Sequence, residues 1–365
     1  MRSWIVIAGI ALSIVFQATA SDARRTHLTP EQKEKLKNIQ TVYVNVIALT
    51  ESGRRDPGKL RDIVARRLQE IGYTVVTDRR KPHDVEFKVK CEERKTWTGT
   101  TPEGGDAELA DAPARLWKGP ACLFMYLLDG KDLGWYKEVR TSFEDAYAAA
   151  QAAQVADSGA YAMDKLAERL EVFDFPVLVT AEWGQVDRLL HLLDASTTHR
   201  LRKLKILSEL TELQSDEALP HLTAILKQKD LAQEAIVALA GVGEESIPLL
   251  IDLFTTTKQP EIQAAAAKAL GEVASSTGDP RTIYPLLDYL KRVLPRIKTS
   301  KDINFPVLTQ VVWSLGKLRD DKSMEPIEEL NEKVWLIYDN SKEMAALREA
   351  TNWTYKQLHL DEHIS

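Results

Sequence analysis

The sequence predicts two parts, an α+β N-terminal domain with a mostly antiparallel sheet packed on helices, followed by an all-α array of repeated helix pairs. Two observations support this. From Leu28 to Trp183, segments with strand-like alternation are interspersed with segments of helical spacing. From Gly184 onward, one pattern of helix, turn and helix recurs, which is the signature of a solenoid. The length of 365 residues also fits about two domains.

The first part opens with a short charged helix and a βαβ pattern. Thr41–Leu49 is β-branched and apolar, as in a buried strand. Gly58–Ile71 has apolar residues at helical spacing, and Tyr73–Val76 follows it as a second strand. Asp84–Glu92 alternates strictly between apolar and charged residues, so it predicts a strand with one buried face.

The rest of the domain predicts a hairpin, a helix and a last strand. Ala121–Leu128 and Leu133–Arg140 flank Asp129-Gly130, which is a hairpin turn signal. Phe143–Leu170 is Ala-rich and helical, with a break near Ser158-Gly159. Pro176–Ala181 is predicted as the final strand, so the domain spans residues 21–183.

The repeats align through leucines that end the first helix and prolines that start the second. The leucines, spaced by 29, 31 and 45 residues, are Leu210, Leu239, Leu270 and Leu315; the prolines are Pro220, Pro248, Pro285 and Pro326. The last spacing is long because Val293–Asn304 is an insertion. Asp279-Pro280 fits an N-cap followed by a first-turn proline, and Ser246 and Ser323 are further N-cap candidates.

This pattern, over Leu201–Leu336, resembles the HEAT family and is most similar to its short bilin-lyase-type repeat. The resemblance implies a curved array of antiparallel helix pairs, over residues 184–365, that binds proteins. It does not imply lyase activity. The alternative for the same residues is a plain helical bundle.

The N-terminus has the features of a secretory signal peptide in residues 1–20. Arg2 precedes the apolar stretch Ile5–Phe16, and Ala18-Thr19-Ala20 forms an A-x-A site. We therefore expect cleavage after Ala20, a mature chain that begins at Ser21, and a periplasmic or secreted protein. An uncleaved N-terminal anchor is the alternative.

The segment Asn38–Val89 resembles small envelope domains, namely the lipopolysaccharide-assembly lipoprotein and the N-terminal domain of the Tol-system propeller protein. The resemblance lies in a strand reading TVYV before a helix, and in a strand reading GYTVV after it. It implies an envelope location and transfers no functional residue.

Cys91 and Cys122 predict a disulfide, because an exported chain with an even cysteine count favours pairing. If the two face each other across a wide hairpin, Lys95 faces Lys118 and Trp97 lies within one residue of Trp117. The bridge would close a loop of about 30 residues and contribute about 3–4 kcal/mol. Two buried free thiols are the alternative, and no further ligands suggest a metal site. The segment Thr98–Arg115 between the strands is either a mobile or a recognition loop.

Charge and motifs exclude several classes of function. The net charge is −6 and no block of like charge is evident, which argues against nucleic acid. The sequence contains no nucleophile elbow and no P-loop, so no catalytic residue and no cofactor are predicted. His359-Leu-Asp-Glu-His363 matches the H-x-x-E-H zinc-protease pattern. The sequence stops two residues later without a third ligand, so we expect a C-terminal tail and no metal.

The second helix of each repeat carries mixed charges that predict a partner-binding surface. Its principal candidates are Asp252, Asp288, Lys291 and Glu328, with His221, Lys227 and Glu329 beside them. We therefore expect a non-catalytic scaffold that binds another envelope protein. The alternatives are an accessory factor that binds a lipid or glycan through the α+β domain, and an enzyme whose site the sequence does not reveal. The sequence does not say which face of the array is concave, nor the oligomeric state.

Overall fold

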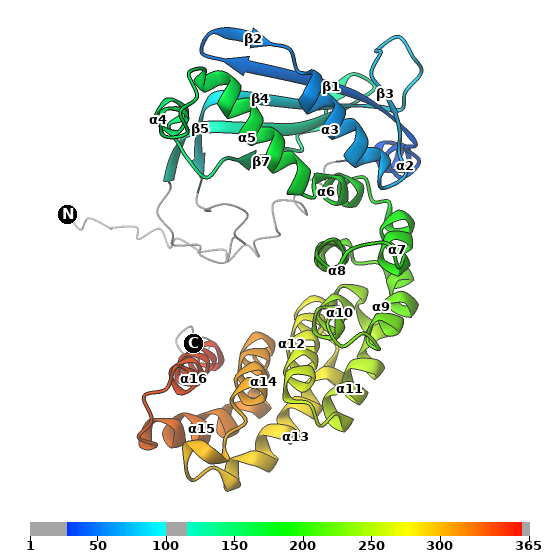
Figure 1. Cartoon of the computed structure of the whole chain (residues 1–365). Coiled ribbons are helices and arrows are strands. Elements are labelled where there is room, and N and C mark those ends of the chain that lie inside the picture. The colour runs from blue at the N-terminus through cyan, green and yellow to red at the C-terminus, as the bar shows by residue number, and fades with distance from the viewer. Residues whose placement is uncertain (1–27, 100–114, 360–365) are drawn as a thin grey trace, which may run out of the picture. The chain divides into compact units, whose positions relative to one another are not determined.

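The structure is a computed structural model that describes residues 28–99 and 115–359, with the side chains of 94–99 and 115–118 left out. The chain divides into two compact units, Met1–Phe173 and Asp174–Ser365. Figure 1 shows the strands in the first unit and a succession of helices in the second.

The first unit is built on a mixed sheet in the order β2-β1-β4-β5-β6, with β3 also paired to β1 and β7 to β5. The strands are β1 (Thr41–Thr50), β2 (Gly53–Arg55), β3 (Thr74–Val76), β4 (Val85–Gly99), β5 (Arg115–Leu128), β6 (Lys131–Asp132) and β7 (Lys137–Arg140). β1 runs parallel to β3 and β4, and the other described pairings are antiparallel. The predicted α+β sheet is confirmed, with a parallel centre that follows from the βαβ crossover.

Helices cover one face of this sheet. They are α2 (Pro30–Lys37), α3 (Gly58–Gln69), α4 (Ala146–Ala152) and α5 (Ser158–Val172). α3 and α5 lie side by side across the strands (Figure 1). The apolar residues of β1, from Val42 to Ala48, point toward them and are at most 4% exposed, while the alternate residues are half-buried. The predicted break in the Ala-rich helix is confirmed by the gap between α4 and α5.

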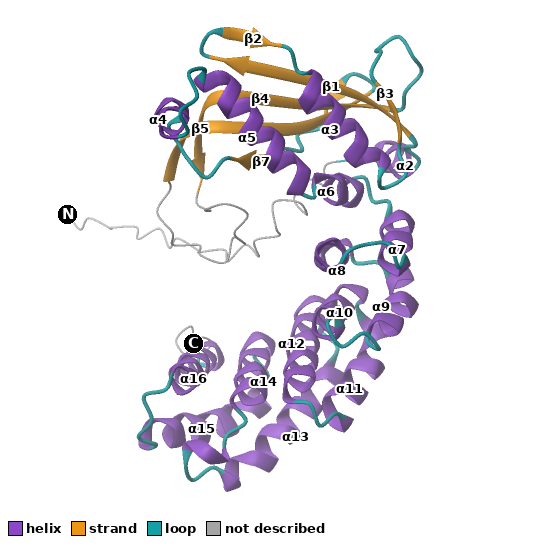
Figure 2. Cartoon of the chain, viewed as in Figure 1, coloured by secondary structure: helices purple, strands orange, loops and turns teal. Residues whose placement is uncertain are grey.

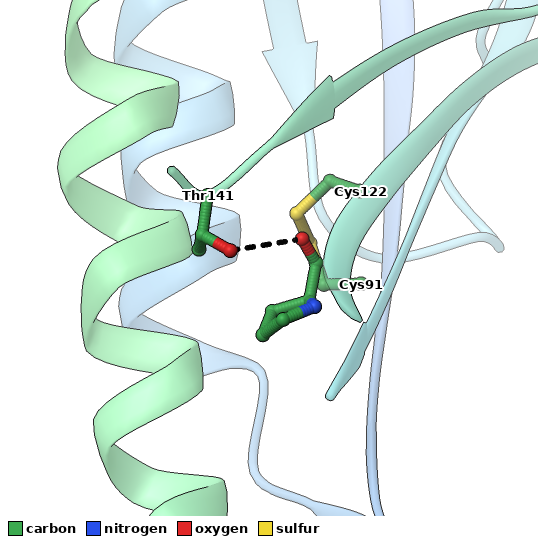
Figure 3. The surroundings of a disulfide bond; sticks show 4 residues. Cys91, Cys122 and Thr141 are labelled. Atoms are coloured by element: carbon green, nitrogen blue, oxygen red, sulfur yellow. Dashed lines mark hydrogen bonds between the residues drawn. A yellow bond between two sulfur atoms is a disulfide. The ribbon is translucent and has the colours of Figure 1, made fainter. Parts of the chain in front are cut away.

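The Cys91–Cys122 disulfide joins β4 to β5 inside the sheet. The two residues are direct partners in the ladder, with their Cα atoms 3.9 Å apart. Figure 3 shows the Thr141 hydroxyl beside the bridge, where it donates to the Pro120 carbonyl at 3.4 Å. The disulfide predicted from the strand register is therefore present.

The predicted register fails just beyond the bridge, because β4 contains a bulge between Glu92 and Lys95. Pro120 lies opposite the bulge, where a residue without an N–H does not break the ladder. Lys95 therefore pairs with Gly119 instead of Lys118. The same shift places Trp97 directly opposite Trp117 in the backbone ladder.

Two further details of the first unit follow from local chemistry. Asp129 and Gly130 both have positive φ, 51° and 75°, which is the two-residue turn that twisted hairpins prefer. The bulge also turns Glu93 inward, where it is 5% exposed. Its carboxylate accepts from the Glu51 N–H and from the Ser158 hydroxyl, both at 2.8 Å, so this buried charge is satisfied.

The second unit consists of antiparallel helix pairs. They are α6 (Phe175–Glu182) with α7 (Val186–Asp194), α8 (Arg200–Leu213) with α9 (Leu219–Ile225), α10 (Ala232–Leu239) with α11 (Ile247–Thr256), α12 (Pro260–Thr277) with α13 (Ile283–Val293), α14 (Phe305–Leu318) with α15 (Met324–Leu336), and a final α16 (Lys342–Leu358). The four predicted pairs are present. The insertion between α13 and α14 contains two 3₁₀ turns, Leu294–Arg296 and Ser300–Asp302.

The predicted strand Pro176–Ala181 is wrong, because these residues lie in helix α6, drawn as a helix in Figure 2. Every residue of α6 is buried, so its valines are held in a helix by packing against α7 and α8. Tertiary burial overrides β-propensity in such a segment. The compact units accordingly divide before α6, whereas the sequence placed the domain boundary after it, at Trp183.

A 3₁₀ turn precedes the second helix of each predicted pair, and its last residue is buried. These residues are Ala218, Ser246, Thr282 and Ser323. Asp279 caps its turn as predicted, since its side chain accepts from the Arg281 N–H at 2.8 Å. The two serines occupy N-cap positions, but their hydroxyls do not cap. Ser246 donates back to the Gly243 carbonyl at 2.8 Å, and the Ser323 hydroxyl has no partner among the described residues.

Candidate interaction surface

The second unit has two layers of helices, and this arrangement decides which side chains a partner meets. Figure 1 shows the first helices of the pairs, α6, α8, α10, α12, α14 and α16, along the concave side. The second helices, α7, α9, α11, α13 and α15, form the convex side. The partner-binding candidates all come from second helices, so they belong to the convex layer.

The concave layer is held together by glycines that let helices approach closely. A Cβ on Gly271 of α12 would lie 2.4 Å from the Ser314 hydroxyl of α14. A Cβ on Gly316 of α14 would lie 2.5 Å from the Thr354 hydroxyl of α16. Both are impossible separations, so these two positions require glycine unless the helices move apart. The Leu-Gly pattern of the repeats is thus a packing signal.

Buried hydroxyls bridge the same helices. Ser314 donates to the Ala267 carbonyl of α12 and Thr354 donates to the Val312 carbonyl of α14, each at 2.9 Å. These bonds cross between helices and are fully enclosed, where a hydrogen bond is strengthened by the low dielectric. The stack α12–α14–α16 is therefore a rigid support for whatever its surface binds.

The solvent side of this stack has an ion pair and two tryptophans. Lys317 of α14 pairs with Glu272 of α12. Trp313 and Trp353 lie one on each of α14 and α16, with ring centres 4.8 Å apart, and both are half-buried. Sequence reasoning missed this pair, although a tryptophan on each of two neighbouring helices of the array was a readable signal.

On the convex layer, three of the four principal candidates are exposed. Asp252 lies on α11, and Asp288 and Lys291 lie on α13. Glu328 of α15 is only half-exposed, because its carboxylate accepts from the His359 Nε2 at 3.2 Å. Its charge is partly engaged within the unit. Asp252, Asp288 and Lys291 are therefore better placed than Glu328 to contact a partner.

Asp288 lines a hollow of about 440 Å³ between α11 and α13. Phe254, Tyr284, Tyr289 and Arg292 also contribute to its walls. The Arg292 guanidinium lies 5.7 Å from the centre of the Tyr289 ring, and burial raises the pKa of the Tyr289 phenol. The hollow combines aromatic faces with one acid, Asp288, and two bases, Arg281 and Arg292, which is the composition of a protein-binding groove.

The secondary candidates also have partners within the array. His221 of α9 lies 2.6 Å from the Asp194 carboxylate of α7, so it links two convex helices. Lys227 is exposed at the end of the same pair, and Glu329 pairs with Lys333 at 3.1 Å.

The other motifs give no site within the described residues. His359 makes a local contact, in which its Nδ1–H donates to the Tyr355 carbonyl at 2.8 Å. Glu362 and His363 lie outside the described residues. Among residues 28–99 and 115–359, no three metal-ligating side chains come together and no helix is both long and apolar enough to cross a bilayer. The predicted signal peptide, with Ala18, Ala20 and Ser21, lies outside the described part of the chain, and so does the centre of the segment 98–115.

Sequence reasoning also missed a basic run. Residues 291–302 read KRVLPRIKTSKD, with five basic residues and one acid, a net charge of +4 in a chain of net charge −6. The run was overlooked because apolar residues separate its charges. It covers the end of α13 and the insertion.

Comparison with known proteins identifies the repeats. Residues 219–300 match the family model of HEAT repeats. No curated protein matches the chain. One solved structure that matches is the crystal structure of an engineered protein from the Northeast Structural Genomics Consortium, at 18% identity and a TM-score of 0.33. The match covers 60% of this chain and 98% of that one.

Proposed function

From a C-terminal half built of HEAT repeats, we propose that this protein is a non-catalytic scaffold that binds another protein through its helical array. The observation that carries the proposal is the rigid two-layered stack, which presents corresponding faces of successive helices as one extended surface. Exposed, mixed charges on the convex layer favour a protein partner over a polyanion.

We assign the contact to the convex surface formed by Asp252, Asp288 and Lys291, together with the hollow beside Asp288. These three side chains are exposed, so substituting them leaves the core intact. Their contribution to binding is then separable from any contribution to folding.

The test is a pull-down from envelope extract, with the chain that begins at Ser21 as bait. The variant Asp288→Lys with Lys291→Glu exchanges the charges without changing the net charge. The matched control, Glu349→Lys with Lys356→Glu, makes the same exchange at exposed positions on α16 of the concave layer. We expect the first variant to lose a partner that the wild type captures, and the control to retain it, at equal melting temperatures.

The opposite result moves the binding site. Loss in the α16 control alone assigns the partner to the concave layer with its Trp313–Trp353 pair. Capture unchanged in both variants contradicts binding through either tested surface of the array and shifts attention to the α+β unit.

We further propose that the protein is exported and acts in the cell envelope. The A-x-A site at Ala18-Thr19-Ala20 supports export, and so does the Cys91–Cys122 disulfide, because disulfides persist in oxidising compartments. N-terminal sequencing of the protein from its native cells tests this, with Ser21 as the expected first residue. Met1 retained on membrane-bound protein would contradict cleavage.

A second candidate function is the binding of a lipid or glycan through the sheet. The sheet face opposite α3 and α5 carries half-buried rows in which a charged residue of β4 lies between two residues of β1 and β5. Examples are Tyr43–Glu86–Leu127 and Ile47–Lys90–Leu123. The double variant Tyr43→Ser with Leu127→Ser should abolish capture of the lipid or glycan if this sheet face binds it. The same variant should not affect capture if the helical array binds the ligand.

A further inference from the structure

The insertion between α13 and α14 gathers exposed positive charge at one edge of the second unit. Arg296, Lys298 and Lys301 are all exposed, and none forms an ion pair with any described residue. The acid of the segment, Asp302, is engaged locally. Its carboxylate accepts from the backbone N–H groups of Lys298 and Thr299, at 3.1 and 2.8 Å. The three bases outnumber this acid, so the insertion Val293–Asn304 carries a net charge of +2 that can attract anions.

The end of α15 presents large apolar side chains beside this charge. Leu336 is 85% exposed, Tyr338 is 93% exposed and Trp335 is 61% exposed. Leu336 and Tyr338 are the two most exposed of the large apolar residues that the structure describes. Three such side chains within four residues are unusual for a water-facing surface, where exposed apolar residues are normally scattered singly.

A single arginine fixes this segment. Arg348 of α16 donates to the carbonyls of Val334, Ile337 and Asp339, at 3.0, 2.7 and 3.1 Å. Its guanidinium also lies 5.3 Å from the centre of the Trp335 ring. These three carbonyls therefore accept hydrogen bonds from within the unit and do not need water. Leu336 and Tyr338 nevertheless project into solvent.

The basic and the apolar segments are physically joined. Lys333 of α15 donates to the Leu294 carbonyl at 2.8 Å. The Ser300 hydroxyl bonds to the Asp339 carboxylate and holds its pKa below the usual range. A hollow of about 420 Å³ lies between them, lined on one side by Ile297 and Lys298 and on the other by Leu336 and Tyr338. One base of the insertion, Lys298, and two of the apolar side chains, Leu336 and Tyr338, therefore line the same hollow.

We infer that the surface formed by Arg296, Lys298, Lys301, Trp335, Leu336 and Tyr338, here named the aromatic–basic patch, docks on an anionic lipid membrane. Trp, Tyr and Leu beside Lys and Arg are the side chains that settle at the boundary between headgroups and acyl chains. Each base near an anionic bilayer strengthens binding about fivefold. The patch adds to the protein-binding array and does not depend on it.

A bilayer fits these observations better than an acidic peptide does. A peptide partner would need its own pocket to enclose Leu336 and Tyr338, which protrude almost fully, whereas a fluid bilayer accepts any protruding apolar group. The bases are also spread along the insertion instead of converging on one point, as suits a continuous field of headgroups. An acidic peptide is retained as an outcome of the test.

The test is co-sedimentation of the chain that begins at Ser21 with vesicles. This form keeps every described residue and lacks the N-terminal apolar stretch. We expect partition onto vesicles of equal parts phosphatidylcholine and phosphatidylglycerol, and little onto phosphatidylcholine alone. Lys298→Gln with Lys301→Gln should weaken partition at least about tenfold. Leu336→Ser with Tyr338→Ser should weaken it by about tenfold or more.

Two matched controls distinguish binding through the patch from a general effect of lost positive charge or lost exposed apolar surface. Lys229→Gln with Lys258→Gln removes two exposed charges elsewhere, and Leu201→Ser removes a leucine that is 70% exposed. Both should bind anionic vesicles as the wild type does. Raising the salt to about 1 M, where the Debye length is about 3 Å, should release the wild type.

Three results overturn the proposal. The first is no partition of the wild type onto anionic vesicles. The second is partition that the patch variants and the controls reduce equally. The third is an absence of vesicle binding combined with capture of an immobilised polyglutamate peptide that the patch variants lose, which would make the patch a protein site.

Discussion

The two units of this protein hold their shape by different means. In the first, residues far apart in sequence pair in one sheet, and a disulfide ties its two longest strands at Cys91 and Cys122. In the second, each helix contacts its neighbours in the stack, as α12 contacts α10 and α14. A change in the sheet unit is therefore felt throughout it, whereas a change in the array loosens one interface and its neighbours. The predictions below test this difference.

The largest effect should come from the disulfide. Replacing Cys91 and Cys122 by serine removes a cross-link between residues 31 apart in sequence, which should lower the free energy of unfolding of the sheet unit by about 3–4 kcal/mol. Hydrogen exchange measured by mass spectrometry should show faster exchange throughout β1, β4 and β5 and no change in α12 or α14. Faster exchange confined to residues next to the cysteines would contradict the cooperative behaviour of the sheet.

The next effect concerns the helix stack. Gly271→Ala places a methyl group where the Ser314 hydroxyl lies, so α12 and α14 must separate at a cost of about 1–3 kcal/mol. Ser275→Ala, at an exposed position one turn later on α12, is the control and should cost under about 0.5 kcal/mol. Thermal denaturation followed by circular dichroism compares them. Equal melting temperatures would show that the stack tolerates a wider spacing.

A smaller effect should come from the hydroxyl bridges. Thr354→Val keeps the shape of the side chain and removes the bond to the Val312 carbonyl, so we expect a loss of about 1 kcal/mol. Exchange should speed up in α14 and α16 and remain unchanged in α8. A uniform change along all helices would mean that the array unfolds as one unit and that the nearest-neighbour description is wrong.

The link beneath the aromatic–basic patch should be sensitive to acid. The Ser300 hydroxyl, first among several hydrogen bonds, lowers the pKa of Asp339 in the folded state. A lowered carboxyl pKa stabilises the fold above the unfolded-state pKa, near 3.9, and this contribution is lost as the pH falls through the lowered value. The protection of backbone amides against hydrogen exchange at the α15–α16 connection should therefore fall only below about pH 4. The variant Asp339→Asn should show reduced protection of these amides at neutral pH, and its protection should not fall further in acid.

The smallest effect should be a gain. Gln214 ends α8 with φ of 50°, a left-handed conformation that favours glycine. Gln214→Gly should raise the stability of the array by up to about 1 kcal/mol. A lower melting temperature than wild type would contradict this, and it would assign the Gln214 side chain a stabilising role.

The sequence predicted features that depend on local pattern. Alternation along β4 predicted its buried face and, through it, the pairing of Cys91 with Cys122. The leucine and proline spacing predicted four helix pairs. It did not predict α6, because Phe175–Glu182 reads as a strand by propensity and becomes helical only through complete burial among other helices. The position of the bulge opposite Pro120 was likewise not predictable, because it depends on the pairing of strands throughout the sheet.

Parts of the candidate surface were unpredictable for a related reason. Exposure of Asp288 and Lys291 follows from helical periodicity, and it is confirmed. The engagement of Glu328 by His359 joins residues 31 apart in sequence, which only the stacking of α16 on α15 brings together. The same holds for the insertion and the end of α15, whose contact creates the aromatic–basic patch.

The hydroxyl bridges of the concave layer give the array a direction. Ser314 of α14 donates to α12, and Thr354 of α16 donates to α14, so each of these bonds runs from the later helix back to the earlier one. The two ends of the stack are chemically unequal as a result. A designer who wished to lengthen the protein by a further pair after α16 would need a helix that brings its own serine or threonine.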